Sequence, residues 1–372
     1  MAATGSAEQI GIRSAHEFAG AQATWPRGDR PAALRESAGD FRARFKGQGE
    51  IRAVRTVDLA AAGYPAAYAF QGAAKGLNPY VNTVNRLVVV QFEDFDGELR
   101  TLAWEPTVPV GSAGPPLHAP LLERFGEWFS SQVLTTDYRT VPEALARIGL
   151  RPGDVDFVSF GHLHAQDLRV TMGTTEPLPG ENEARPPLFP KASFVLQRKE
   201  VDTLRSVHPT QGAWYVPGAM DAVIEDRLVQ VDGDVELGVG CALVHTPGQT
   251  DGHQSLCINT PEGVWLASRN GVAADSWHPH LSKIPGVRKW AELFGREVVM
   301  NANTLEDSVD QYDSMIKEKA VADVNRRDPR WLNLFPCSEL ASSRRQWPIV
   351  PTFVCGGMNY GRVESSPVSD GA

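Results

Sequence analysis

Residues 156–169 read Asp156-Phe-Val-Ser-Phe-Gly-His-Leu-His-Ala-Gln-Asp-Leu-Arg169. The apolar part of this stretch is typical of a β-strand, and it leads directly into two histidines that are two positions apart. Side chains at positions i and i+2 of an extended chain point the same way, so His162 and His164 can present two imidazoles to one metal ion or one substrate. This pair is the main indication of a functional site.

The residues before this strand predict an α/β unit. Residues 140–149 begin with a Thr cap, carry Pro in the first turn and Glu143 three positions after Thr140, and end at Gly149. That is the pattern of a short helix. A Pro-Gly-Asp turn at 152–154 then leads into the strand. The histidines therefore fall at the carboxyl end of a strand, where α/β sheets usually carry their chemistry.

This order resembles the metal-binding segment of the metallo-β-lactamase-fold hydrolases, whose pattern is H-x-H-x-D-H. Residues 245–253, His-Thr-Pro-Gly-Gln-Thr-Asp-Gly-His, resemble the family's H-T-P-G-H-T-x-G-H segment. Residues 266–270, Leu-Ala-Ser-Arg-Asn, resemble the family's strand that ends in Gly-Asp. The resemblance covers roughly residues 80–305. It implies an α/β fold, the four-layer αββα sandwich of that family, in which two metals activate a bridging water.

Several positions depart from the family pattern. Gln166 stands at the family's Asp position, Asp167 at its third His, Gln249 at the middle His of the second segment and Asn270 at the bridging Asp. We find no counterpart of the last metal-binding histidine in the tail. Neutral amides are poor substitutes for imidazole or carboxylate ligands. Two alternatives stay open: one ion held by His162, His164 and Gln249 or Asp167, or a hydrogen-bonded relic of a lost centre.

Three charged residues beside these segments are candidates for catalysis and substrate binding. Asp167 is the candidate catalytic residue, as a general base or as an acceptor that orients a histidine. Arg169 and Arg269 are candidate substrate-binding residues, which would suit an anionic or nitro-bearing group or would simply replace the lost positive charge. Many family members carry Asp-x-Gly where this chain has Trp104-Glu-Pro-Thr107. We interpret that departure as neutral.

A second histidine pair lies in residues 269–280. His278 and His280 flank Pro279, and Asp275 lies nearby. These side chains could replace the lost ligands, but the interpretation we prefer is an exposed loop pair. The four cysteines, Cys241, Cys257, Cys337 and Cys355, have no C-x-x-C spacing and predict reduced, structural thiols.

Composition excludes some functions. The 372 residues include 36 Lys and Arg against 45 Asp and Glu, a net charge of -9, with no basic run that would favour nucleic acid. No apolar run approaches the roughly 18 residues that span a bilayer, and the start lacks the features of a signal peptide. We therefore expect a cytoplasmic protein without a nucleic-acid or membrane partner.

The predicted organisation has three parts: an N-terminal arm at 1–50, disordered or crossing a neighbouring subunit, the metallo-β-lactamase-like domain at 51–325, and a C-terminal extension at 326–372. A hairpin is predicted at 85–104, with Asp96-Gly97 as its turn. Apolar spacing predicts a helix at 121–133 and a surface helix at 304–324 with Met315 in the core.

The leading functional hypothesis is a hydrolase subunit. Its own metal site is degenerate, and a related chain that keeps H-x-H-x-D-H supplies the catalytic metals, zinc or manganese. The likeness is to the two-subunit aryl ether hydrolases that O-demethylate dinitroanisole, which implies a small aromatic ether or ester substrate. The alternatives are an autonomous single-metal hydrolase of an ester or lactone, and a non-catalytic binding or scaffold protein.

Overall fold

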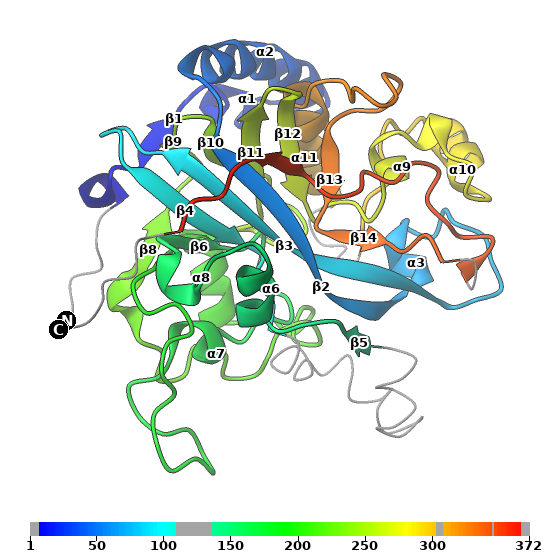
Figure 1. Cartoon of the computed structure of the whole chain (residues 1–372). Coiled ribbons are helices and arrows are strands. Elements are labelled where there is room, and N and C mark those ends of the chain that lie inside the picture. Colours follow the sequence, from blue (N-terminus) through cyan, green and yellow to red (C-terminus); the bar gives the residue numbers. More distant parts are fainter. Residues whose placement is uncertain (1–6, 109–134, 303–307, 344–345, 366–372) are drawn as a thin grey trace.

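The computed structural model describes residues 7–108, 135–302, 308–343 and 346–365 (Figure 1). Its first sheet has six strands, all antiparallel except for the last pair. In spatial order they are β1 (Arg13–Ala15), β9 (Asp234–Gly238), β10 (Cys241–His245), β11 (Gln254–Thr260), β12 (Gly263–Ser268) and β13 (Leu334–Pro336).

The second sheet has nine strands, and its main path starts antiparallel and ends parallel. This path runs through β15 (Asn359–Gly361), β2 (Ala53–Pro65), β3 (Tyr80–Glu93), β4 (Leu99–Trp104), β6 (Phe157–Ser159), β7 (Ser193–Gln197) and β8 (Leu228–Val231). The short strands β5 (Thr135–Asp137) and β14 (Ser338–Leu340) pair with β2 and β3. The predicted hairpin is confirmed as β3–β4, and Gly97 in its turn has a φ of 88°.

Helices cover the outer face of each sheet. The second sheet packs against α6 (Val141–Arg147), α7 (Leu168–Met172) and α8 (Arg198–Arg205), and the first against α1 (Ala19–Gln22), α2 (Arg30–Gln48) and α11 (Ser308–Val321). Figure 1 shows α2 above and α6 to α8 below the sheets. A third apolar cluster joins the inner faces, with Val90 and Trp104 from one sheet and Leu243 and Ile258 from the other. The predicted four-layer αββα architecture is confirmed.

A fourth apolar cluster lies at one end of the sandwich. It includes residues of α3 (Ala66–Ala69) and α10 (Val287–Phe294), and α9 (Ala274–Trp277) begins beside it. Short 3-10 turns occur at Ala7–Ile10, Arg27–Asp29, Pro152–Asp154, Glu225–Arg227 and Pro279–Leu281.

The helix before the histidine segment forms as the sequence predicts. Thr140 caps α6, because its hydroxyl accepts from Glu143 N and the Glu143 carboxylate accepts from Thr140 N at 2.8 Å. The chain then passes through the 152–154 turn into β6. This short route places His162 and His164 directly beyond the end of a central strand.

Both ends of the sequence contribute to the sandwich. Segment 1–50, which we expected to form an arm, supplies β1 and α2, and Phe41 and Phe45 of α2 are fully buried. Segment 326–372 adds β13, β14 and β15 to the two sheets. The domain boundaries at 51 and 325 stay predictions. The helix predicted at 121–133 lies outside the described residues.

The prediction of a surface helix at 304–324 was wrong about its surroundings. Helix α11 packs under α2, so Gln311, Lys317 and Glu318 are buried together with Met315, which is in the core as predicted. Lys317 and Glu318 looked solvent-facing only because the sequence does not show that they meet partners on distant strands, such as Asp234 of β9 and Ser255 of β11. Buried Lys317 is paired with Asp234 at 2.7 Å.

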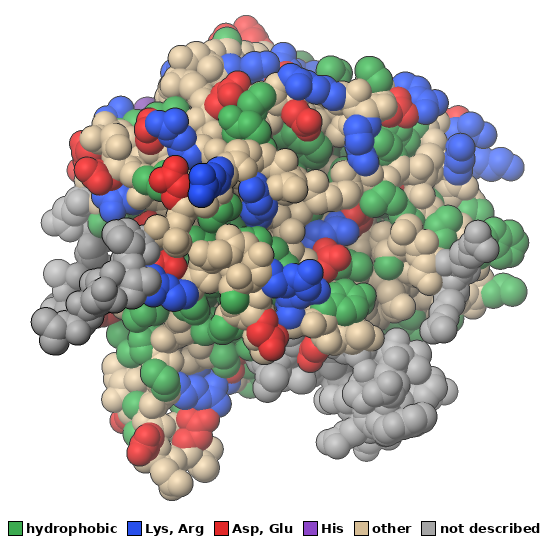
Figure 2. Space-filling view, viewed as in Figure 1, with side chains coloured by type: hydrophobic (Ala, Val, Ile, Leu, Met, Phe, Trp, Pro, Cys, Tyr) green, Lys and Arg blue, Asp and Glu red, His purple; other side chains and the backbone are tan. Residues whose placement is uncertain are grey.

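Surface and cysteine predictions can be checked directly. All four cysteines are free and buried, so the prediction of structural thiols is confirmed. Figure 2 shows Lys and Arg side chains interspersed with Asp and Glu over the face it presents. Within the described ranges, no helix combines the length and the apolar character needed to cross a membrane.

Candidate functional site

The three segments that resemble family motifs converge on one cavity. Strand β6 leads into His162 and His164, β10 leads through a turn to Gln249, and β12 leads to Arg269. All four side chains line a cavity of ≈ 120 Å³, together with Gln166, Trp214 and Tyr64. The three segments that the sequence singled out therefore meet at one place in the fold.

The residues predicted as metal ligands are brought together. His162, His164 and Gln249 are buried side chains in the wall of this cavity. The His162 and His164 rings lie 4.6 Å apart between centroids at an angle of 84°, and the ring of His253 lies 5.4 Å from that of His162. The i, i+2 spacing does place two imidazoles side by side.

These imidazoles are neutral at pH 7. Burial lowers the pKa of His162 well below its ordinary value, and the neighbouring His164, His253 and Arg269 lower it further. Burial, followed by the charge of Arg269, lowers the pKa of His164 to about 3. Burial also lowers the pKa of His253 to about 3, although its hydrogen bond to the Thr246 backbone acts in the opposite direction.

Arg269 forms a buried ion pair that the sequence did not reveal. Its Nη2 lies 2.8 Å from Oε2 of Glu105, and the Glu105 side chain is fully buried. The contact is a close ion pair rather than a well-directed hydrogen bond. The other Glu105 oxygen accepts from Gly161 N at 2.9 Å. Glu105 thus ties the histidine segment to the β12 segment.

Glu105 belongs to the stretch that we interpreted as a neutral departure, and that interpretation was wrong. Glu105 has a φ of 58°, a left-handed conformation that is uncommon outside glycine. Thr107 accepts from Gln166 Nε2 at 3.1 Å and from Arg269 Nη2 at 3.3 Å. The sequence did contain a signal for this contact, because an acidic residue directly follows β4, where the chain departs from the family pattern.

Asp167 and Arg169 lie elsewhere. The Asp167 carboxylate accepts from Arg169 N and pairs with the Arg169 guanidinium at 2.7 Å, at the start of α7. Neither residue is among the described residues that line the cavity. The catalytic role of Asp167 and the substrate-binding role of Arg169 stay predictions, whereas Arg269 faces the cavity.

Asn270 is committed to a different network. Its Nδ2 donates to Glu318 Oε1 at 2.8 Å, and the same carboxylate group accepts from Ser255, Ser268 and Trp277. Burial raises the pKa of Glu318, and these hydrogen bonds act against the shift. The position expected to hold a bridging carboxylate therefore helps to connect β12 to α11.

Glu200 of α8 positions two of the converging loops. It accepts from Leu163 N at 2.7 Å and from Thr250 Oγ1 at 2.5 Å, which joins the histidine loop to the loop of Gln249. Burial raises the pKa of Glu200 to about 7, against the effect of these hydrogen bonds. Gly252 packs on the same residue, since a Cβ there would lie 2.3 Å from Glu200 N.

Aromatic and amide side chains complete the wall. The Trp214 ring lies 5.9 Å from the His164 ring in a stacked arrangement, and Tyr64 lies 6.5 Å from Trp214. Tyr64 OH donates to Asn301 Oδ1 at 2.6 Å, and burial raises the Tyr64 pKa. The cavity therefore offers flat apolar faces beside polar groups, as small-molecule sites commonly do.

The residues of this cavity do not fit the two-metal centre that the family resemblance implies. Within the described ranges, no three or more His, Cys, Asp or Glu side chains are grouped to hold a metal ion. The nearby carboxylate of Glu105 is paired with Arg269. The groups that remain beside the histidines among the described lining residues include neutral amides, which are poor ligands for a divalent cation.

His245, His253 and His278 have structural partners. His245 Nε2 lies 3.0 Å from Asp251 O, and His253 Nδ1 lies 2.9 Å from Thr246 O, so both stabilise the 245–253 turn. His280 is exposed, and His278 packs against Trp331. Asp275 accepts from Ser282 and Thr352 at 2.5 Å each. Neither His278 nor His280 lines the cavity.

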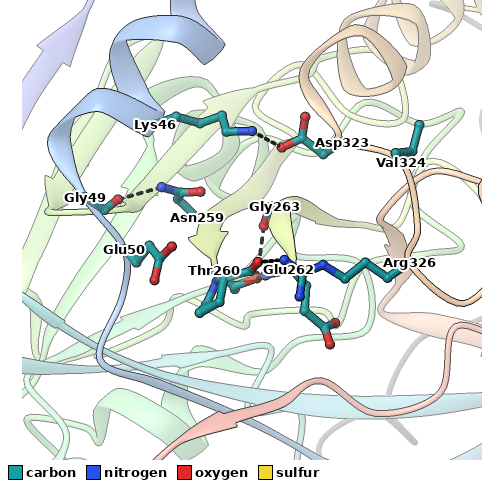
Figure 3. A pocket seen from close by; sticks show the side chains of 11 residues that line it. Lys46, Gly49, Glu50, Asn259, Thr260, Glu262, Gly263, Asp323, Val324 and Arg326 are labelled. Atoms are coloured by element: carbon teal, nitrogen blue, oxygen red, sulfur yellow. Dashed lines mark hydrogen bonds and ion pairs between the residues drawn. The ribbon is translucent and has the colours of Figure 1, made fainter.

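A larger hollow lies on the far side of the β11–β12 turn, with a volume of ≈ 710 Å³. Figure 3 shows its polar groups pairing with one another, as with Lys46 and Asp323 at 2.7 Å and Asn259 Nδ2 and Gly49 O at 2.7 Å. Its walls mix both signs of charge. It is a weaker candidate than the cavity of the converging loops.

Comparison with known proteins gives a consistent picture. No family model matches the chain. A curated N-acyl homoserine lactonase of a Bacillus species is 29% identical over 137 residues, which are 36% of this chain and 46% of that protein, and the Bacillus cereus lactonase is 27% identical over 137 residues. The chain thus spans about half the length of the curated relatives it matches.

Two solved structures are similar over longer stretches. The crystal structure of a quorum-quenching N-acyl homoserine lactone lactonase has a TM-score of 0.48 and 12% identity, covering 80% of this chain and 96% of that one. A probable metal-dependent hydrolase from Staphylococcus aureus has a TM-score of 0.48 and 13% identity, covering 73% and 84%. A hydrolase in the beta lactamase superfamily is also similar, with a TM-score of 0.41 and 13% identity, covering 73% of this chain and 85% of that one. The chain is thus similar to hydrolases in sequence and in fold, as the motifs predict.

Proposed function

We propose that this chain is the small-molecule-binding subunit of a hydrolase assembly of the metallo-β-lactamase superfamily, in which a related chain supplies the catalytic metals. The observation that carries the proposal is Arg269, whose paired guanidinium lies in the wall where the three family segments converge. The pair occupies the carboxylate that could otherwise bind a cation, and the cavity beside it remains. Bond cleavage is therefore assigned to the partner chain, with zinc or manganese as its metal.

The size and lining of the cavity support a small aromatic ether or ester as the substrate. A volume of ≈ 120 Å³ is comparable to that of engineered cavities of about 150 Å³ that take up benzene. The Trp214 indole gives a flat face for a ring. Cleavage of an aryl ether or ester would require an activated water that the walls of this cavity are not arranged to generate.

The test has two arms. Metal analysis of the purified full-length chain is expected to find well under one equivalent of zinc or manganese, with no restoration on adding either, and no hydrolysis of 2,4-dinitroanisole or phenyl acetate. Co-purification from the native host is expected to recover a related chain that keeps H-x-H-x-D-H and restores hydrolysis when mixed with this one. A metal-loaded isolated chain that turns over either probe would overturn the proposal.

A second candidate function is autonomous lactone hydrolysis, favoured by the N-acyl homoserine lactonases among the curated relatives. It requires His162, His164 and Gln249 to hold one ion beside Arg269. Ring opening of an N-acyl homoserine lactone by the isolated chain, dependent on added zinc and lost in His162→Gln, would favour this function. Absence of ring opening at saturating zinc would exclude it.

A further inference from the structure

The charges around the cavity of the converging loops cancel one another. Arg269 contributes a positive charge, and Glu105, 2.8 Å away with a fully buried side chain, contributes a negative one. Arg269 is the only Lys, Arg, Asp or Glu among the described residues that line the cavity, so its pairing with Glu105 leaves the site without net charge from these groups.

The same walls retain hydrogen-bonding capacity. Arg269 has five N–H donors, of which Nη2 serves Glu105 and Thr107, while Nε has no hydrogen-bond partner among the described residues. The Nδ1 atom of His162, a side chain only 2% exposed, has none in the same part of the chain. Arg269 lines the cavity, so a ligand with an accepting oxygen can receive a hydrogen bond from its guanidinium.

An anion gains little from an arginine whose charge is already balanced. It would lose part of its hydration on entering the cavity and would lie near the Glu105 carboxylate that pairs with the guanidinium. An uncharged molecule avoids that loss and can still accept a hydrogen bond. The left-handed backbone of Glu105 shows that this balancing carboxylate is held in place at a conformational cost.

We infer that the cavity takes an uncharged, ring-sized molecule with a hydrogen-bond-accepting oxygen, of the ester, lactone or ether class, and discriminates against the corresponding carboxylates and other anions. The inference rests on the proposed function only in placing the substrate in this cavity. The sequence suggested that Arg269 binds an anionic or nitro-bearing group or replaces the lost positive charge. In this inference its guanidinium instead donates a hydrogen bond to an uncharged ligand. An anionic hydrolysis product would consequently leave readily.

The experiment compares two probes that share a ring and differ in charge. Binding of methyl benzoate and of benzoate to the full-length chain is measured at pH 7.5 by ligand-observed NMR and calorimetry. We expect saturable binding of methyl benzoate and at least tenfold weaker binding of benzoate. Equal affinity, a preference for benzoate, or no saturable binding of either probe would overturn the inference.

A charge-unmasking variant sharpens the test. Glu105→Gln keeps an acceptor for Gly161 N and leaves the Arg269 charge unbalanced, so benzoate binding is expected to rise at least tenfold relative to methyl benzoate. Glu236→Gln is the matched control, because it unbalances Arg44, 2.7 Å away, neither residue lines the cavity, and the preference should not change. A folded Glu105→Gln protein with the wild-type preference would contradict the inference. If that variant does not fold, the wild-type comparison decides alone.

These outcomes are separable from those of the proposed function. The preference is read from binding to the isolated chain, without a partner and without turnover. Hydrolysis of methyl benzoate by the isolated, metal-loaded chain would count against the proposed division of labour and would leave the preference for an uncharged ligand standing.

Discussion

Two arginine–carboxylate pairs lie next to the family-like segments, and they differ in almost everything except their chemistry. Arg169 and Asp167 are two positions apart, and the pair is partly exposed at the start of α7. Arg269 and Glu105 come from distant parts of the chain and meet in the wall of the cavity, where the carboxylate is fully buried. Both arginines lie next to a motif in the sequence, yet only Arg269 lines the cavity. Proximity to a motif therefore does not show which ion pair belongs to the site.

The largest difference should appear when each arginine is removed. Arg269→Met leaves the Glu105 carboxylate buried without its partner, which costs about 3–5 kcal/mol of unfolding free energy. Arg169→Met leaves Asp167 8% exposed and still accepting from the backbone N–H of residue 169, so the loss should be smaller, about 1–2 kcal/mol. Urea unfolding of both variants measures the gap. Equal losses would mean that the two pairs are equivalent after all.

A smaller effect is expected from crowding Glu105. A Cβ at Gly161 would lie 2.9 Å from Glu105 Oε1 and 3.2 Å from Gln254 O, so Gly161→Ala should lower stability by up to about 3 kcal/mol and weaken ligand binding. Gly153 has no atom within 4 Å of such a Cβ, and Gly153→Ala serves as the control, with a change within about 0.5 kcal/mol. Thermal unfolding reports both.

Because the buried histidines are neutral, the free energy of unfolding should depend on pH. The folded pKa of His164, about 3, lies below its ordinary value of 6.5, so protons bind the unfolded chain more readily. The stability contribution is therefore present above pH 6.5 and is lost as pH falls toward 3. Between pH 7 and pH 5 the wild type should lose about 2 kcal/mol that His164→Gln does not lose. Parallel stability curves for the two proteins would exclude a buried neutral His164.

The smallest effect concerns the link between Gln166 and Arg269. Thr107→Val keeps the shape of the side chain and removes the shared acceptor, at a cost of about 1 kcal/mol. The Arg269–Glu105 pair should persist, so the preference for methyl benzoate over benzoate should remain. Loss of that preference in a stable Thr107→Val protein would show that Thr107, and not Glu105, sets the character of the cavity.

The sequence by itself determined the local parts of this protein. The Thr140–Glu143 cap and the Asp96-Gly97 turn depend on neighbouring residues, and the i, i+2 spacing was enough to place His162 beside His164. Only the tertiary structure decided that Glu105 would balance Arg269 and that Lys317 and Glu318 of α11 would be buried against strands of the first sheet. Those contacts join segments far apart in the chain, and their strength comes from burial, which no single stretch of sequence encodes.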